Sequence, residues 1–161
     1  MSNLRPFWLL IVLGAFVCLT LMPGPEPSRA QQQRFEPKLE AVAETKLLME
    51  GLAKANFQGL DRLLREQPTK LETWKFIRGQ SLLVAETGNL LMLRPPKTEP
   101  ARTVWFQKAT ELRKAGLAVA TSASQKDFNT TRVNFVKLAN ACNSCHKSFS
   151  VRVQVTPFGK L

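Results

Sequence analysis

The chain has 161 residues, of which 44% are hydrophobic. This size and composition suit one folded domain with a packed core, and they exclude a chain that is disordered over most of its length. The formal net charge of +11 favours acidic partners, anionic membrane surfaces or nucleic acid, without choosing among them.

Residues 1–30 have the pattern of a signal peptide. Arg5 precedes an uncharged apolar run over residues 7–22, and Ser28 and Ala30 supply the small residues that a signal peptidase reads. The apolar run is short for a bilayer span. We therefore expect cleavage after Ala30 and export to the periplasm, whereas an uncleaved leader would anchor the chain in the membrane.

The mature domain, residues 31–161, divides at proline-rich or polar breaks into four segments with helical periodicity. We expect helices over about 37–66, 71–92, 101–122 and 128–150. Helices of similar length joined by short loops predict an all-α fold, an antiparallel four-helix bundle. An irregular helical domain is the alternative.

In the first segment, apolar residues recur at steps of three and four, and Gly51 and Gly59 predict a kink or an early end near Gly59. The stripe is Leu39, Val42, Lys46, Met49, Ala53, Phe57, Leu60 and Leu64.

Consecutive prolines after residue 94 end the second segment, because proline removes a backbone donor. The third segment has Trp105, Ala109, Leu112, Gly116 and Val119 on one face.

We expect Ser124 or Asp127 to cap the fourth segment. This segment carries Phe135, Ala139, Cys142, His146 and Phe149 at steps of four and three. Residues 151–155 are expected to form a short extended tail.

The fourth segment contains Cys142-Asn143-Ser144-Cys145-His146, with the single histidine of the chain. On a helix the two cysteines lie one turn apart on one face, and His146 points into the same sector as Cys142. C-x-x-C-H is the attachment motif for c-type haem. Two thiols form thioethers with two vinyl groups, and the adjacent imidazole binds the iron. We therefore expect one haem c, attached through Cys142 and Cys145, with His146 as the proximal ligand.

Three other kinds of site compete for these residues. A redox-active dithiol usually occupies a strand-loop-helix context, and none is predicted here. A structural zinc site needs four ligands, so a carboxylate or a second subunit would have to complete it. A structural disulfide in a non-haem helical exported protein is the third, although cysteines one helical turn apart bridge poorly. The leader, which carries away Cys18, and the helical context favour haem.

With its leader, four helical segments and C-x-x-C-H-x-x-F near the C-terminus, the chain resembles the cytochrome c-prime family, the class II c-type cytochromes. The resemblance covers about residues 36–150 and is specific at Cys142, Cys145, His146 and Phe149. Many members carry a basic residue where this chain has Ser150. Lys147 and Arg152 are the candidate substitutes.

The resemblance implies that the first helix supplies the residue on the distal side of the haem. The low-spin branch of the family uses a methionine there, in a stretch similar to the one around Met49, and Met92 is the only other methionine of the mature chain. A thioether ligand makes a closed site suited to electron transfer. If neither methionine binds, a five-coordinate iron behind apolar residues such as Leu48 or Leu52 would bind NO or CO.

These residues predict a one-electron carrier, not an enzyme. We expect a redox partner protein with an acidic surface, because the chain is basic. Dimerisation is common in the family, so a homodimer is a further expectation. No nucleic-acid motif is found, and no nucleic-acid partner is expected.

Overall fold

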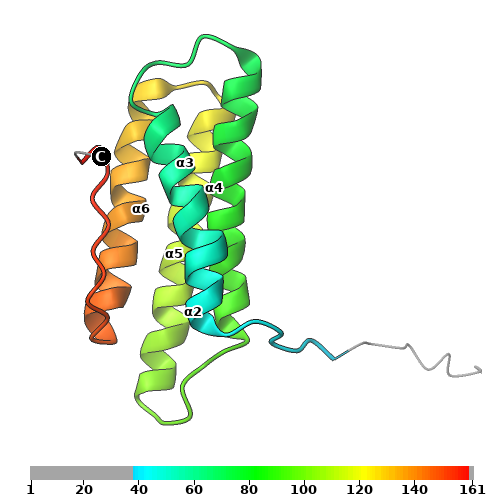
Figure 1. Cartoon of the computed structure of the whole chain (residues 1–161), viewed down its shortest axis with the longest axis vertical. Coiled ribbons are helices and arrows are strands. Elements are labelled where there is room, and N and C mark those ends of the chain that lie inside the picture. Colours follow the sequence, from blue (N-terminus) through cyan, green and yellow to red (C-terminus); the bar gives the residue numbers. More distant parts are fainter. Residues whose placement is uncertain (1–37, 160–161) are drawn as a thin grey trace, which may run out of the picture. The chain divides into compact units, whose positions relative to one another are not determined.

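The structure, a computed structural model, describes residues 38–159. The expected leader, with Cys18, Ser28 and Ala30, lies outside the described residues, so its cleavage stays a prediction. Over residues 38–159 the chain is all-helical, with four helices and no strand (Figure 1). The predicted helical bundle is confirmed at this level. Within the same range, no helix combines the length and apolarity needed to cross a membrane.

The first helix begins at Thr45, later than predicted. The residues described before it are not helical, and Glu44 has extended backbone angles (φ −65°, ψ 153°). Leu39 and Val42, which we assigned to the apolar stripe, are 77% and 97% exposed. A helical segment in a protein gains most of its stability by packing an apolar face. These two side chains pack on nothing, so the stripe prediction is wrong at its first two positions.

The first helix consists of three consecutive pieces, α2 (Thr45–Leu48), η1 (Met49–Lys54) and α3 (Ala55–Leu63). The middle piece, η1, is π-helical, a rare geometry that is frequent at functional sites. The first helix does not end at Gly59, which lies inside α3; it ends at Leu63, a little before the predicted end at residue 66. Gly59 is buried within α3, and an added Cβ would overlap the Gln80 amide. The glycine thus permits close packing instead of ending the helix.

The other three helices are α4 (Leu71–Met92), α5 (Ala101–Ser124) and α6 (Phe128–Ser148). The bounds of α4 agree with the prediction, and α5 and α6 differ from it only at their last turns. Asp127 caps α6, because its side chain accepts a hydrogen bond of 3.0 Å from the Thr130 backbone N–H. Of the two predicted caps, Asp127 is therefore confirmed.

Helix α5 packs against both α4 and α6. The contact with α4 is close at two glycines. A Cβ on Gly88 would lie 2.7 Å from the Ala109 carbonyl oxygen, and one on Gly116 would lie 2.8 Å from the Ala85 backbone nitrogen. Only glycine allows the two backbones to approach this far.

The core lies between the four helices and follows the predicted apolar faces. Its largest fully buried apolar side chains are Leu60, Leu64, Ile77, Val84, Val119, Phe135 and Leu138. On α6, Phe135 and Ala139 are buried as predicted, whereas Cys142, His146 and Phe149 on the same face are half-buried. The lower burial of these three residues marks the place where the packed core gives way to a cavity.

The chain reverses direction after α6. Ser150 takes the left-handed conformation (φ 55°), and the Val151 N–H donates to the His146 carbonyl over 2.8 Å. A left-handed residue of this kind commonly closes a helix and redirects the chain. Residues 151–159, called the tail below, then run back alongside α6 (Figure 1). The tail is non-helical, as predicted, and forms no strand.

The end of the tail is held on the bundle by aromatic and charged groups. The Phe158 ring lies edge-on to Phe135, with ring centroids 5.5 Å apart, and the Arg132 guanidinium lies 4.2 Å from the Phe158 centroid. The Phe158 backbone N–H also donates to the Asp61 carboxylate. The tail is therefore a packed part of the domain, which the sequence pattern did not indicate.

Candidate functional site

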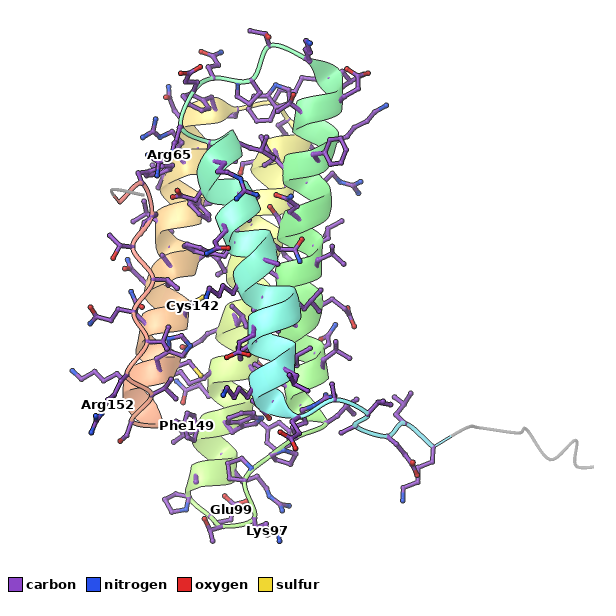
Figure 2. The ribbon with its side chains drawn as sticks, in the orientation of Figure 1. Arg65, Lys97, Glu99, Cys142, Phe149 and Arg152 are labelled. Atoms are coloured by element: carbon purple, nitrogen blue, oxygen red, sulfur yellow. The ribbon has the colours of Figure 1, made fainter. Side chains whose placement is uncertain are left out.

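One cavity of about 990 Å³ is lined by the first helix, α4, α5, α6 and the tail. Met49, Cys142, Cys145 and His146 all line it. Figure 2 shows Cys142 and Phe149 on the side of α6 that faces the rest of the bundle. The structure therefore brings together, around a single space, all four site residues predicted from the sequence.

The size and the walls of this cavity suit a large apolar cofactor. Its volume is at the upper end of the range of about 300–1,000 Å³ that is usual for ligand and cofactor pockets. The apolar part of the wall includes Phe57, Val84, Leu91, Trp105, Leu112 and Phe149. Mostly apolar walls with a few polar groups are typical of such pockets. A porphyrin ring fits this description.

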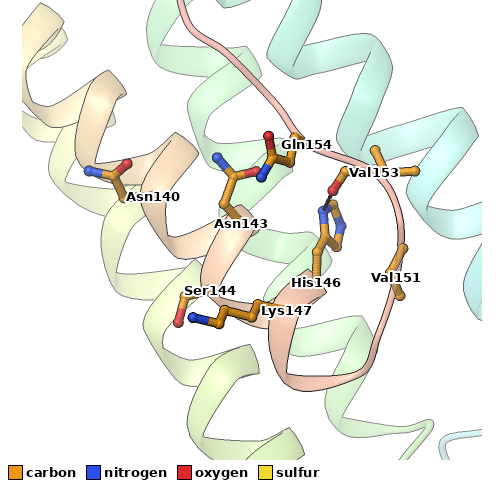
Figure 3. Close-up of a pocket in the computed structure, with 8 residues that line it drawn as sticks. All are labelled: Asn140, Asn143, Ser144, His146, Lys147, Val151, Val153 and Gln154. Atoms are coloured by element: carbon orange, nitrogen blue, oxygen red, sulfur yellow. Dashed lines mark hydrogen bonds between the residues drawn. The ribbon is translucent and has the colours of Figure 1, made fainter.

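The imidazole of His146 is held in one tautomer. Its Nδ1 lies 2.7 Å from the Val153 carbonyl oxygen, as the dashed line in Figure 3 shows. A carbonyl oxygen can only accept, so Nδ1 carries the proton and donates it. In the neutral imidazole this arrangement leaves the lone pair on Nε2. A neutral imidazole with Nδ1–H bonded to a backbone carbonyl is the usual state of a histidine that ligates a metal.

The two cysteines are free thiols on α6. Burial, with a smaller contribution from Cys145, raises the pKa of the Cys142 thiol to about 12. Burial also raises the pKa of the Cys145 thiol, although the nearby positive charge of Lys108 acts to lower it. A redox-active dithiol needs a lowered thiol pKa. The raised pKa of both thiols therefore disfavours the dithiol alternative. So does their position on a continuous helix, instead of in a strand-loop-helix context.

The two residues between the cysteines are bonded to other elements. Asn143 exchanges two hydrogen bonds of 2.9 Å with the Val155 backbone on the tail. Lys108 on α5 donates a bond of 2.9 Å to the Ser144 hydroxyl and also pairs with Glu111. Sequence reasoning missed both residues, because C-x-x-C-H leaves its two middle positions open. Their partners lie far away in the chain.

Of the two methionines, the cavity selects Met49. Met49 opens the π-helical piece η1 and lines the cavity, half-buried. Met92 packs against the hydrophobic core and is not part of the cavity wall. Leu48 and Leu52, which we expected to cover a five-coordinate iron, also pack in the core and not on the wall.

Trp105 forms part of the cavity wall and not only of the core. Its indole N–H donates to the Leu91 carbonyl over 2.7 Å, which fixes the ring. The Phe149 ring lies edge-on to it, with centroids 5.1 Å apart. Trp74 is buried in the core, with its N–H bonded to the Pro68 carbonyl. The two tryptophans therefore differ in role.

The cavity also carries basic side chains on the first helix. Lys46, Lys54 and Arg62 line it and are exposed at its edge. Ammonium and guanidinium groups form charge-assisted hydrogen bonds with carboxylates. Haem bears two propionate carboxylates, so these residues fit the polar edge of that cofactor.

A second cavity, of about 500 Å³, lies between α6 and the tail. Asn143, His146 and Lys147 line it together with Val153 of the tail (Figure 3). Lys147 is therefore close to the histidine, whereas Arg152 is exposed and lines neither cavity. Of the two candidate substitutes for a basic residue at position 150, Lys147 is the better placed.

Among residues 38–159, no three His, Cys, Asp or Glu side chains gather as a site for a metal ion. The carboxylate that a protein-only zinc site would require is thus not grouped with Cys142, Cys145 and His146. The groups present are two thiols, one imidazole lone pair and one thioether around an apolar space. They fit a haem that brings its own four nitrogen ligands.

No protein-family model matches the chain, and a search of curated proteins also finds no match. The resemblance to cytochrome c-prime therefore rests on the motif and the helices of this chain alone.

Proposed function

We propose that this protein is an exported, mono-haem c-type cytochrome that carries single electrons. The observation that carries the proposal is the one cavity lined by Met49, Cys142, Cys145 and His146. When bound, haem c supplies an iron that cycles between Fe(III) and Fe(II). No substrate is converted on the protein, so it acts as a carrier and not as an enzyme.

Cys142 and Cys145 would hold the cofactor covalently. Each thiol would add its S–H across the C=C bond of a vinyl group, the sulfur bonding to one carbon and the hydrogen to the other. The two additions would form two thioethers without any oxidant or reductant. Because the thiols lie one helical turn apart on α6, both can reach the same edge of a porphyrin.

His146 and Met49 would hold the iron in this proposal. The Nε2 lone pair of His146 would ligate it from α6, while Nδ1–H stays bonded to Val153. Met49 offers its thioether from the first helix, and a thioether favours ferrous iron. The apolar side chains of the wall would limit the access of water to the iron. Such a closed site favours electron transfer at the porphyrin edge.

The proposed architecture is an antiparallel four-helix bundle with haem on its last helix, as in the cytochrome c-prime family. The contacts of residues 85 and 88 on α4 with residues 116 and 109 on α5, respectively, support the antiparallel order, because the sequence order of the contacts is reversed. Location in the periplasm is part of the proposal and rests on the leader at residues 1–30.

The second candidate function is the binding of NO or CO by a five-coordinate iron. It applies if Met49 fills the core beside the haem without ligating. The placement of Met49 on the cavity wall favours ligation, and with it electron transfer. Small gases would then find no open position on the iron.

Absorption spectra with and without CO distinguish these two functions. We expect low-spin ferric and ferrous spectra that CO leaves unchanged. Met49→Ala should open the sixth position and give spectra that shift with CO, whereas the control Met92→Ala should leave them closed. A wild-type spectrum that already shifts with CO would remove Met49 from the iron and make gas binding the function.

The basic surface supports docking of an acidic redox partner. With a net charge of +11, the protein should attract such a partner over a Debye length, which is about 8 Å at physiological salt. We expect the rate of electron exchange with an acidic partner to fall as salt rises. Rates that do not depend on ionic strength in stopped-flow measurements would refute this docking.

A further inference from the structure

Asn143, inside the C-x-x-C-H unit, makes a paired contact with one residue of the tail. Its side-chain Nδ2 donates to the Val155 carbonyl over 2.9 Å, and the Val155 N–H donates to Asn143 Oδ1, also over 2.9 Å. The side-chain amide thus satisfies both backbone groups of Val155, as a neighbouring strand would. This pair is the hydrogen-bonded attachment of the tail to α6 next to the histidine.

The same stretch of tail carries the carbonyl that holds the histidine. Val153, two residues before Val155, accepts the His146 Nδ1–H over 2.7 Å. In an extended chain, residues two apart point to the same side. On α6, Asn143 and His146 are three apart and also share a face. The two contacts therefore act together, with one extended segment laid against one helical face.

The remaining contacts of the tail lie farther along it. Asp61 accepts from the Phe158 N–H, and Arg65 donates to the Gly159 carbonyl over 2.8 Å. These bonds hold the end of the tail on α3 and its flanking turn. Between Val151, whose N–H donates to the His146 carbonyl over 2.8 Å, and these end contacts, the described tail is hydrogen-bonded only through Val153 to His146 and through Val155 to Asn143.

We propose that Asn143 is a positioning residue for His146. By clamping Val155, Asn143 sets the Val153 carbonyl against Nδ1–H, which directs the Nε2 lone pair into the cavity and increases the electron density of the ring. This inference rests on the proposed function, in which Nε2 binds the haem iron. It assigns the first of the two open positions of the motif a part in setting the redox potential.

The sign of the effect follows from the direction of the hydrogen bond. Donation from Nδ1–H to a carbonyl increases the electron density of the ring and strengthens its ligation. A stronger donor favours Fe(III) over Fe(II) and lowers the midpoint potential. Loss of the clamp should therefore raise the potential.

The test compares Asn143→Ala with Asn140→Ala in the haem-loaded full chain. Asn140 is the matched control, since it is an exposed asparagine one turn earlier on α6. Alanine favours the helix at both positions, so both variants should fold, which circular dichroism can verify. The two readouts are the midpoint potential and the hydrogen exchange of the Val155 backbone amide.

We expect Asn143→Ala to speed exchange at Val155 and to shift the ferrous-to-ferric ratio upward by up to about tenfold, a rise of about 59 mV for one electron. Asn140→Ala should change neither readout. Faster exchange with an unchanged potential would overturn the positioning role, and unchanged exchange would overturn the clamp itself. If no variant and not even the wild type carries haem, the proposed function fails instead, and exchange at Val155 still reports on the clamp.

Discussion

The two sides of this bundle differ in how closely their helices approach each other. Between α4 and α5 the backbones approach until only glycine fits at Gly88 and Gly116. Between α6 and the first helix, a cavity of about 990 Å³ separates the elements, and the α6 residues Cys142 and His146 face it half-buried. One side of the domain is thus closed by its own backbone. The other leaves a cavity between its elements.

This difference shows that one apolar stripe on a helix can face a packed core at one end and a cavity at the other. The apolar stripe of α6 continues without change from Phe135, which is fully buried, to Phe149 at the cavity. A pattern of spacing reports which face of a helix is turned inward. It does not report whether protein or a cofactor fills the space in front of that face.

The largest effect on the free energy of unfolding is expected where α4 and α5 touch. Gly116→Ala places a Cβ 2.8 Å from the Ala85 backbone nitrogen, and overpacking of this kind costs about 1–3 kcal/mol. The matched control is Gly79→Ala on α4, where nothing lies within 4 Å of the added carbon. It should stabilise the protein by about 0.5–1 kcal/mol, because alanine favours a helix more than glycine does.

Thermal unfolding measures both changes. Opposite signs for the two glycines would support the close contact. Equal changes in the free energy of unfolding would mean that α4 and α5 do not approach as closely as described.

A smaller effect on the fold is expected on the cavity side. Ala53 lies in η1 and lines the cavity, so Ala53→Leu should extend into free space and change the stability by no more than about 0.5 kcal/mol. It should, however, reduce haem loading, because it occupies volume that the porphyrin needs. Ala55→Leu, on an exposed position nearby, is the control and should load normally. Haem content per protein, from absorption, gives the result.

Full loading of Ala53→Leu would contradict the assignment of this cavity to haem. Loss of helical content in the same variant would contradict the contrast between the two sides.

The closed side of the bundle was predictable from the sequence. The bounds of α4 follow from its apolar period and from the prolines that come after it, and Asp127 was recognisable as the cap of α6. In each case the signal is local. It depends on residues within one or two turns.

The first helix and the tail were predictable only in part. Leu39 and Val42 fit the apolar period, yet no surface covers them, and propensity without packing does not make a helix. The π-helical geometry of η1 has no simple pattern of residues. The bonds of Asn143 and His146 to the tail depend on the reversal at Ser150, which is a serine in a conformation usually taken by glycine. The sequence predicted four residues that prove to line one cavity, but it did not predict the tail whose Val153 carbonyl is bonded to His146.

The most direct test of this account is the mass of the intact protein. The full chain should be produced in a host that attaches c-type haem and compared with the double variant Cys142→Ser/Cys145→Ser. We expect the wild type to show the mass of the mature chain plus one haem, which persists through denaturation, and the double variant to show the chain alone. A wild-type mass without haem, two hydrogens below that of the reduced chain, would indicate a disulfide between Cys142 and Cys145. It would contradict the central claim that these cysteines hold a haem.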